Sequence, residues 1–276
     1  MIAPDRPGAG EGVNRPRSDG PLVIDQHEGW AEIRVDREAK RNAMDRASRT
    51  ALLDAFEALR GQARAIILTG TGGSFCAGMD LKERSAEVAA GREDAGEQWI
   101  AVNMAIRKHP AIFIAAVNGL ALGGGSTLIN VCDLAVASTK ASIGCPEMGF
   151  STYPGMAGPA AQLSGITRKQ AAWLVLTTNR IDGATAERWG MVNECVEPEQ
   201  LLPRAREMAS QLAQFDAVAL AESKFALDRI PAFITDWQQA MDHGQMVNST
   251  IRGKSRAQAE GLARFASGQK NPGQGV

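Results

Sequence analysis

The sequence has few residues of the kinds that crosslink chains or bind metal ions. Its 276 residues include 4 cysteines and 3 histidines. The cysteines are widely spaced, with no CxxC pair and no histidine-rich cluster beside them: Cys76, Cys132, Cys145 and Cys195. The sequence therefore predicts neither a disulfide framework nor a metal site. Free thiols fit a reducing compartment, and we expect the protein to be cytoplasmic.

The sequence also lacks a long apolar run and an excess of charge of one sign. No stretch approaches the roughly 20 consecutive apolar residues that a membrane span needs. The formal net charge is −1, which gives no general attraction to nucleic acid or to anionic membranes. Basic residues cluster only in the short segments 40–41 and 107–109. We therefore expect no nucleic-acid partner and no membrane partner.

Composition divides the chain into three parts. The first 20 residues are rich in Pro, Gly, Arg and Asp and lack the apolar middle part of a secretory signal, so we expect a disordered leader over residues 1–20. The remaining length can bury a sizeable core. We expect an α/β core over residues 21–200 and a helical C-terminal region over residues 201–276.

Apolar periodicity predicts strands that alternate with helices. Strands are expected at residues 22–24, 30–35, 65–69, 111–117, 133–137 and 192–196. Helices are expected from a cap at Asp45 to about residue 60, and at 96–108, 124–131, 170–177, 184–189, 201–213, 217–228, 234–246 and 257–266. The strands at 111–117 and 133–137 are almost wholly apolar, which is typical of strands covered on both faces.

Two glycine-rich segments follow predicted strands. Residues 69–82 read TGTGGSFCAGMDLK, and residues 118–125 read NGLALGGG. Glycines permit a close backbone approach, so N–H groups in these loops can hold a negative oxygen, and Gly124 can donate from a helix start. The spacing matches neither GxGxxG nor GxxxxGK[ST], so it does not support nucleotide binding. A tight strand-to-helix connection is the alternative interpretation of each loop.

A single carboxylate, Glu147, follows Pro146 in the segment 141–150, ASIGCPEMGF. The charged form of an acid between apolar residues is disfavoured, which raises its pKa towards the range useful for proton transfer. Glu147 is thus a candidate acid/base. The alternative is a surface glutamate in a loop, the usual place of an isolated Glu.

Taken together and in this order, the motifs resemble those of the crotonase superfamily, also called the enoyl-CoA hydratase/isomerase family. The resemblance covers roughly residues 22–270 and is carried by several ordered segments. These are KRNAM at 40–44, FCAGMDLKE at 75–83, VNG at 117–119, GGG at 123–125, CDL at 132–134, PE at 146–147, PG at 154–155, LT at 176–177, RI at 180–181, GMVN at 190–193 and EGLARF at 260–265.

The resemblance implies a spiral of ββα units with a helical C-terminal trimerisation region, as a homotrimer or a dimer of trimers. It also implies an acyl-CoA thioester substrate. Coenzyme A is then part of the substrate, and no separate cofactor is expected. The N–H groups of Met79 and Gly124 would form an oxyanion hole around the thioester oxygen, and Glu147 would be the acid/base.

The resemblance further implies residues that bind the CoA part of the substrate. Ala43, Ala77, Asp80 and Leu81 would line the CoA groove. Near the C-terminus, Phe265 and Lys270 would reach the CoA bound to a neighbouring subunit.

The chain departs from this family at one catalytic position. Hydratases of the family typically carry two glutamates, and here Thr127 stands at the first position, 20 residues before Glu147 at the second. Thr127 has no acid/base capacity near neutral pH, although its hydroxyl can orient a water or accept a hydrogen bond.

The departure leaves several reactions open. Hydratase or isomerase chemistry on an enoyl-CoA with Glu147 as the single acid/base is our first expectation, and a hydroxycinnamoyl-CoA hydratase-lyase or an acyl-CoA decarboxylase is the alternative. Hydratase-lyases need a phenol-binding tyrosine, and the only tyrosine is Tyr153. His243 is a second acid/base or a helix-surface residue. A non-catalytic CoA-binding or scaffold protein is the alternative of a different class.

Overall fold

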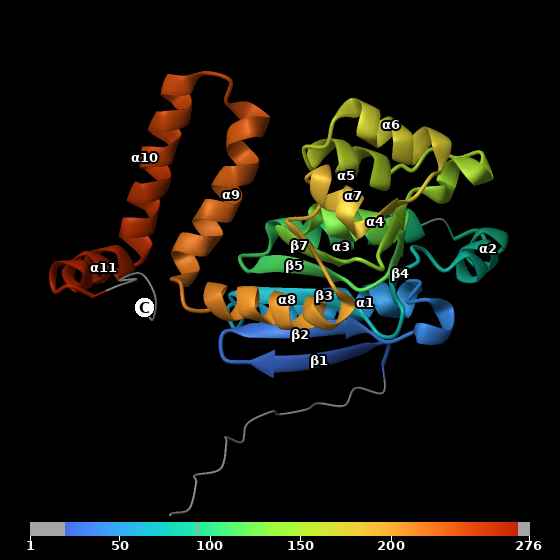
Figure 1. Ribbon diagram of the computed structural model, residues 1–276, viewed down its shortest axis with the longest axis horizontal. Coiled ribbons are helices and arrows are strands. Elements are labelled where there is room, and N and C mark those ends of the chain that lie inside the picture. The colour runs from blue at the N-terminus through green and yellow to red at the C-terminus, as the bar shows by residue number, and fades with distance from the viewer. Residues whose placement is uncertain (1–19, 93, 270–276) are drawn as a thin grey trace, which may run out of the picture.

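The computed structural model describes residues 20–92 and 94–269, except the side chains of residues 265 and 266. Its strands form two sheets (Figure 1). The larger sheet has the order β1-β2-β3-β5-β7-β10, with only the β1–β2 pair antiparallel. These strands are β1 Leu22–His27, β2 Trp30–Val35, β3 Ala65–Gly70, β5 Ile112–Val117, β7 Leu134–Ser138 and β10 Glu194–Val196.

The smaller sheet is made of short strands in the order β4-β6-β8-β9. Its first three strands are parallel, and β9 pairs antiparallel with β8. The strands are β4 Ser74–Cys76, β6 Leu120–Leu122, β8 Ser142–Gly144 and β9 Ile181–Asp182.

Eleven α-helices and two short 3-10 helices lie in the described part of the chain. The α-helices are α1 Arg46–Leu59, α2 Leu81–Ala89, α3 Ala95–Lys108, α4 Gly124–Val131, α5 Ala157–Leu163, α6 Arg168–Thr177, α7 Gly183–Arg188, α8 Pro198–Leu212, α9 Ala217–Phe233, α10 Trp237–Lys254 and α11 Ala257–Ala266. The 3-10 helices are η1 Glu38–Lys40 and η2 Pro146–Phe150.

The chain repeats one pattern along the sheets. A strand of the larger sheet is followed by a short strand of the smaller sheet and then by helix, as in β3-β4-α2, β5-β6-α4 and β7-β8-η2. This repetition is the spiral of ββα units that the resemblance implies, and the expected fold class is confirmed.

The central strands β3, β5 and β7 of the larger sheet are buried on both faces. Alternate side chains of a strand point to opposite faces, so Ile66 and Leu68 of β3 join the core with α1 and α3, whereas Ala65 and Ile67 face α8. The buried residues Ala205 and Ala209 let α8 pack closely on the sheet. The expected boundary at residue 200 therefore falls inside a helix that packs on the core.

Local sequence explains where several helices begin. The Asp45 side chain accepts a hydrogen bond from the Ser48 N–H and caps α1, as the sequence predicts. In the same way Asp182 caps α7 and Asp216 caps α9. Thr167 and Gln170 form a reciprocal capping box at α6.

The C-terminal helices differ from the expected bounds. Helix α9 was expected to end at residue 228 but continues through Pro231 to Phe233, and α10 runs over 237–254 rather than 234–246. The helix ends two residues after Pro231, which has no N–H to bond the preceding turn. The strand expected at 192–196 is shorter, since Met191 and Val192 are buried in the turn that precedes β10.

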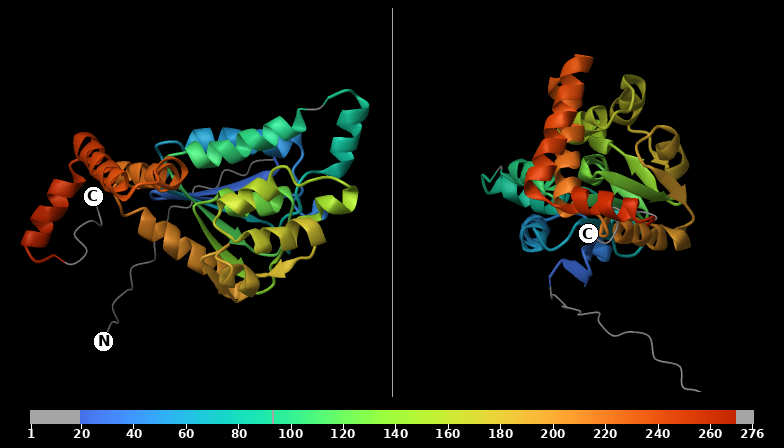
Figure 2. Two further views of the ribbon diagram at one scale, coloured as in Figure 1. Left: turned by 90° about the horizontal axis from the view of Figure 1, so that it is seen from above. Right: turned by 90° about the vertical axis from the view of Figure 1, so that its left-hand side faces the viewer.

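Helices α9, α10 and α11 extend away from the body, with α10 packed along α9 (Figures 1 and 2). A buried lysine anchors α9. Lys224 is 3% exposed, and its Nζ lies 2.9 Å from Asp133 Oδ2 and donates to the carbonyls of Ile106 and Ala111. Asp133 also accepts from Arg107 and from the Phe113 N–H. One carboxylate that is 14% exposed thus joins α9 to two parts of the core.

Within residues 20–92 and 94–269, no helix combines the length and apolar character of a bilayer span. Nor do three His, Cys, Asp or Glu side chains come together there as possible metal ligands. The four cysteines are free, and three of them are buried.

We predict that Lys224→Met lowers the free energy of unfolding by about 3 kcal/mol, because it removes one partner of a buried ion pair and leaves Asp133 less compensated. Denaturant unfolding at a fixed protein concentration measures the change.

The matched control is Arg60→Ala, which breaks the exposed ion pair with Glu57 and should cost less than about 0.5 kcal/mol. Equal unfolding curves for Lys224→Met and the unchanged protein would show that the buried pair does not stabilise the docking of α9.

Candidate active site

Three loops meet at one edge of the smaller sheet. Strands β4, β6 and β8 are parallel neighbours, so their carboxyl ends lie at the same edge. Met79, Gly124 and Glu147 each follow one of these strands by two or three residues. The topology thus places at one edge three residues that are 68 positions apart at their extremes in the sequence.

The loop after β4 passes directly beside the start of α4. Gly78 has φ +90°, and a Cβ at this position would lie 2.7 Å from the Leu122 carbonyl oxygen and 3.4 Å from the Gly124 nitrogen. Only glycine fits this conformation and this approach. Residue 78 is therefore the point where the first loop touches the second.

The Met79 N–H is turned away from the neighbouring backbone. Met44 forms a parallel bridge with Met79, in which the Met44 N–H donates to Gly78 and the Asp80 N–H donates to Met44. Successive N–H groups of an extended segment point to opposite sides. Among the described residues, no backbone carbonyl accepts from the Met79 N–H.

Helix α4 begins with tightly packed glycines. A Cβ on Gly124 would lie 2.7 Å from Cζ2 of Trp99, and a Cβ on Gly125 would overlap the Cys76 carbonyl oxygen. The Gly124 N–H is the first of the helix and has no backbone acceptor in the described part of the chain. This donor lies at the positive end of the helix dipole, which favours a negative oxygen.

The Glu147 carboxylate lies over the start of α4. Gly123 has φ +52°, and a Cβ there would lie 2.6 Å from Glu147 Oε1. Oε2 is buried and has no hydrogen-bond partner within the described residues. Burial raises the pKa of Glu147, and a hydrogen bond from its own backbone N–H only partly opposes this. The position suits a group that both gives and takes a proton.

Thr127 lies one helical turn after Gly123. Its side chain is 1% exposed, and its hydroxyl donates to the Gly123 carbonyl at 3.2 Å. Because the hydroxyl proton is used inside the helix, Thr127 Oγ1 can offer only its lone pairs to a ligand. Thr127 is therefore an acceptor at a buried site and not an acid or base.

Two backbone segments that run side by side carry the expected CoA-groove residues. The Ala77 N–H donates to Arg41, and Ala43 adjoins the bridge between Met44 and Met79. Leu81 is 58% exposed at the start of α2. The carboxylate of Asp80 caps α2 and bonds Arg37, so it already has its partners.

Two asparagine amides, to which we assigned no separate role, hold the turn between β3 and β4. Asn42 donates to the carbonyls of Thr71 and Ser74 at 2.9 and 2.6 Å. Asn118 donates to those of Gly70 and Gly72. Both asparagines stand in the quoted motifs, but their partners are carbonyls of a distant turn, which sequence spacing does not reveal.

Other expected site residues lie elsewhere or outside the description. Phe265 belongs to α11, but its side chain is not described, and Lys270 lies outside the described residues. His243 lies on α10, away from the three loops within this chain (Figure 1). Tyr153 is 54% exposed in the loop before α5, with its hydroxyl close to Gly158.

The buried thiols and the buried histidine do not compete with Glu147 as reactive groups. Burial raises the pKa of Cys76 and of Cys145 to about 12, so neither forms a thiolate near neutral pH. Burial also lowers the pKa of His109 to about 4. Both ring nitrogens of His109 bond backbone groups of Phe56 and Ala111, so this side chain is structural.

One face of α3 packs beside the site. The sequence did not predict a role for the residues on this face. Trp99 and Asn103 are 0% and 7% exposed, one turn apart on this helix. Trp99 packs on Gly124. The sequence signal for this face is a polar residue, Asn103, beside the apolar residues Trp99, Val102 and Ile106, which recur at helical spacing.

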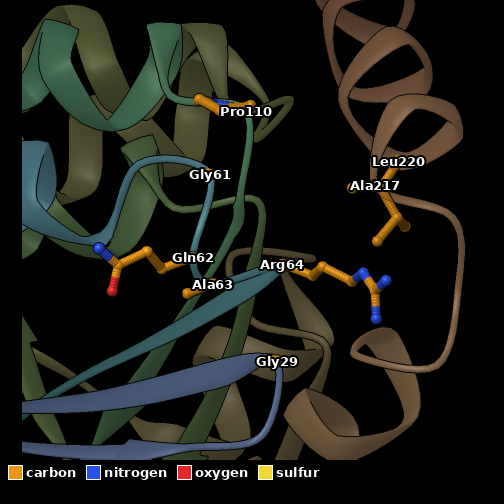
Figure 3. Close-up of a pocket in the computed structure, with 8 residues that line it drawn as sticks. All are labelled: Gly29, Gly61, Gln62, Ala63, Arg64, Pro110, Ala217 and Leu220. Carbon is orange, nitrogen blue, oxygen red and sulfur yellow. The ribbon is translucent and has the colours of Figure 1, made fainter. Parts of the chain in front are cut away.

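A surface hollow of about 270 Å³ lies away from these loops (Figure 3). It is lined by Gly29, Gly61, Gln62, Ala63, Arg64, Pro110, Ala217 and Leu220. Arg64 donates to the Ala213 carbonyl. The lining carries no acid/base pair and no residue of the three loops.

Comparison with known proteins identifies the family of the chain. The model of the family described as enoyl-CoA hydratase/isomerase matches residues 25–272. "Probable enoyl-CoA hydratase echA8" of Mycobacterium leprae is 31% identical, over 88% of this chain and 94% of that protein. Hydroxycinnamoyl-CoA hydratase-lyase of Pseudomonas fluorescens is 29% identical, over 88% and 91%.

The fold matches as well. The crystal structure of enoyl-CoA hydratase from Bacillus anthracis superposes with a TM-score of 0.83 at 26% identity, over 93% of this chain and 100% of that one. Since the family match spans most of the chain and the fold agrees over the same length, the chain belongs to the enoyl-CoA hydratase/isomerase family.

Proposed function

We propose that the protein adds and removes protons at the carbons next to an acyl-CoA thioester, with Glu147 as the single acid/base. The observation that carries this proposal is the position of the Glu147 carboxylate over Gly123, at the N-terminus of α4. A thioester oxygen held by the N–H groups of Met79 and Gly124 would then have its α-carbon within reach of one carboxyl group.

Hydration of a 2-enoyl-CoA needs only this one acid/base. The water oxygen bonds to the β-carbon, and the electron pair of the double bond moves into the thioester to form an enolate. The enolate electrons return as the α-carbon takes a proton from Glu147, and the proton lost by water restores the carboxylic acid. Preorganised N–H donors contribute a few kcal/mol to stabilising such a charge.

Isomerisation uses the same groups without water. Glu147 removes a proton from the α-carbon of a 3-enoyl-CoA, the enolate forms against the two N–H groups, and the proton returns at the γ-carbon. One carboxylate that can hold a proton in a buried position suits this transfer.

The proposed substrate brings coenzyme A, and no further cofactor enters the reaction. Ala43, Ala77, Asp80 and Leu81 are proposed to line the CoA groove, since their segments lie side by side next to Met79. The exposed Lys40 and Arg41 on the same segment offer positive charge to phosphate groups. The four free thiols fit a cytoplasmic protein.

Aldehyde release from a hydroxycinnamoyl-CoA is the second candidate. It is favoured by the 29% identity with the hydratase-lyase of Pseudomonas fluorescens over most of both chains. Feruloyl-CoA as substrate separates simple hydration from the lyase reaction. Hydration alone leaves the carbon skeleton intact, whereas the lyase reaction releases an aromatic aldehyde.

The C-terminal helices are proposed to form a homotrimer or a dimer of trimers. The support is a set of large apolar side chains exposed on α9, α10 and α11 in the single chain. These are Leu227 76%, Phe233 81%, Trp237 81%, Met241 57% and Leu262 63% exposed. Apolar surface of this extent on projecting helices is typical of a surface covered by another chain.

We predict that Glu147→Gln lowers turnover of crotonyl-CoA by about 10²-fold or more, because the amide cannot transfer a proton. Steady-state rates and calorimetric binding of butyryl-CoA measure turnover and affinity separately. Binding should stay within about threefold.

The control for this variant is Glu57→Gln, at a carboxylate that is 71% exposed on α1, which should leave the rate unchanged. An undiminished rate in Glu147→Gln would remove Glu147 from the mechanism.

Glu147→Gln should at the same time stabilise the fold at neutral pH. A carboxyl group whose folded pKa is raised contributes stability that is complete below its unfolded pKa and is lost as pH rises through the folded pKa. At pH 7 the substitution removes the cost of a buried charge, so the melting temperature should rise by about 2 °C.

This gain should disappear as the pH falls below about 4.3, where the glutamate becomes protonated in both states. Calorimetric melting of both proteins from pH 4 to pH 8 provides the comparison. A gain that is constant with pH would assign it to packing rather than to charge.

The exposed apolar side chains of α9 and α10 allow a test of the oligomer. Leu227→Asp and Trp237→Asp should each shift the sedimenting mass from a multiple of three chains towards one chain, because a charge would be buried between subunits. Leu163→Asp is the control, since Leu163 is 89% exposed on α5, outside the C-terminal helices. Unchanged masses in the first two variants would contradict trimerisation through this region.

A further inference from the structure

Three side chains near α4 each carry a buried polar atom without a hydrogen-bond partner in the described part of the chain. The atoms are Trp99 Nε1, Asn103 Oδ1 and Glu147 Oε2. A buried polar atom without a partner costs stability, so native proteins rarely keep one unless a ligand or water bonds it. Glu147 belongs to the proposed chemistry, whereas Trp99 and Asn103 have no assigned role.

The relative direction of α3 and α4 shows which part of α4 lies beside Asn103. At one end Trp99 packs on Gly124, and at the other Arg107 donates to the Val131 carbonyl at 3.1 Å. The two helices therefore lie side by side and run in the same direction. Asn103, one turn from both Trp99 and Arg107, lies level with the middle of α4, where Thr127 and Leu128 are.

Thr127 lies between Asn103 and Glu147. Residues four apart share a helix face, so Thr127 lies on the face of Gly123, against which Glu147 rests. Thr127 is also one turn from Gly124, which faces α3. An acyl chain that leaves the Gly124 N–H along α4 would thus pass Thr127 with Glu147 and Asn103 on either side.

The Asn103 amide is held at one end and open at the other. Its Nδ2 contacts Met156 Sδ at 3.9 Å, a weak acceptor at the start of α5, whereas Oδ1 has no partner in the described part of the chain. Thr127 Oγ1 offers only lone pairs, because its proton is donated to Gly123. Both groups can therefore accept a hydrogen bond from an O–H group, and neither can take up its proton.

We propose that Asn103 is a positioning residue that binds the oxygen at the β-carbon of the acyl chain, together with Thr127. That oxygen arrives as water in the hydration direction and as the hydroxyl of a 3-hydroxyacyl-CoA in the reverse direction. The inference rests on the proposed function, in which Glu147 transfers the proton. It explains how a site with one carboxylate holds the attacking oxygen.

The test compares two reactions of the same site. Deuterium uptake from D₂O at the α-carbon of butyryl-CoA needs the thioester contacts and Glu147 but no oxygen at the β-carbon. Hydration of crotonyl-CoA and dehydration of 3-hydroxybutyryl-CoA need that oxygen. The measured quantity is the ratio of the hydration or dehydration rate to the exchange rate.

In Asn103→Leu this ratio should fall by about 10- to 100-fold while exchange stays within about threefold, and Asn103→Ser should recover part of the loss. A lower kcat on crotonyl-CoA at unchanged KM identifies water as the bound group. A higher KM that appears only for 3-hydroxybutyryl-CoA identifies the substrate hydroxyl. Val102→Ala loosens the same buried helix face and should leave the ratio unchanged.

Two outcomes would overturn the role of Asn103. One is an unchanged ratio of the two rates in Asn103→Leu, whether both rates fall equally or neither falls. The other is that the unchanged protein exchanges deuterium into butyryl-CoA but neither hydrates crotonyl-CoA nor dehydrates 3-hydroxybutyryl-CoA. That result would leave the role of Glu147 intact. Failure of the proposed function itself looks different, because exchange would then be absent or would persist in Glu147→Gln.

Discussion

The close approach of the loop after β4 to the start of α4 is the contact on which the site depends. Gly78, with φ +90°, brings the backbone next to the Gly124 nitrogen, and Gly125 has no room for a Cβ beside the Cys76 carbonyl. A side chain at Gly78 or Gly125 would push the N–H groups of Met79 and Gly124 apart. Because Met79 and Gly124 directly follow β4 and β6, two short parallel strands of one sheet, the spacing of their N–H groups is fixed by that sheet and by α4.

The same packing determines the electrostatics of Glu147. Its carboxylate rests on Gly123, where no side chain can intervene, and burial disfavours its charged form. The N-terminus of α4 beside it favours negative charge, which in the proposed reaction would develop on the thioester oxygen. A single acid that loses and regains its proton is consistent with Thr127, whose hydroxyl is occupied within α4.

The helical extension depends on a different buried charge. Lys224 reaches from α9 into the core and meets Asp133, which follows α4 and precedes β7. The segment that follows α4 is therefore also the attachment point of the projecting helices. A rigid attachment would keep the exposed apolar side chains of α9 and α10 in a fixed orientation relative to the site.

The sequence by itself determined much of this protein. Apolar runs placed β3, β5 and β7, Asp45 placed the start of α1, and the ordered glycine motifs with Glu147 led to the family, because these signals are local. The tertiary structure decided the rest. Strands of two or three residues show no periodicity, so β4, β6 and β8 became visible only through their pairing, and the inward face of Trp99 and Asn103 was fixed by packing against α4. Side-chain partners that lie tens of residues apart are set by three-dimensional contact, which local pattern does not encode.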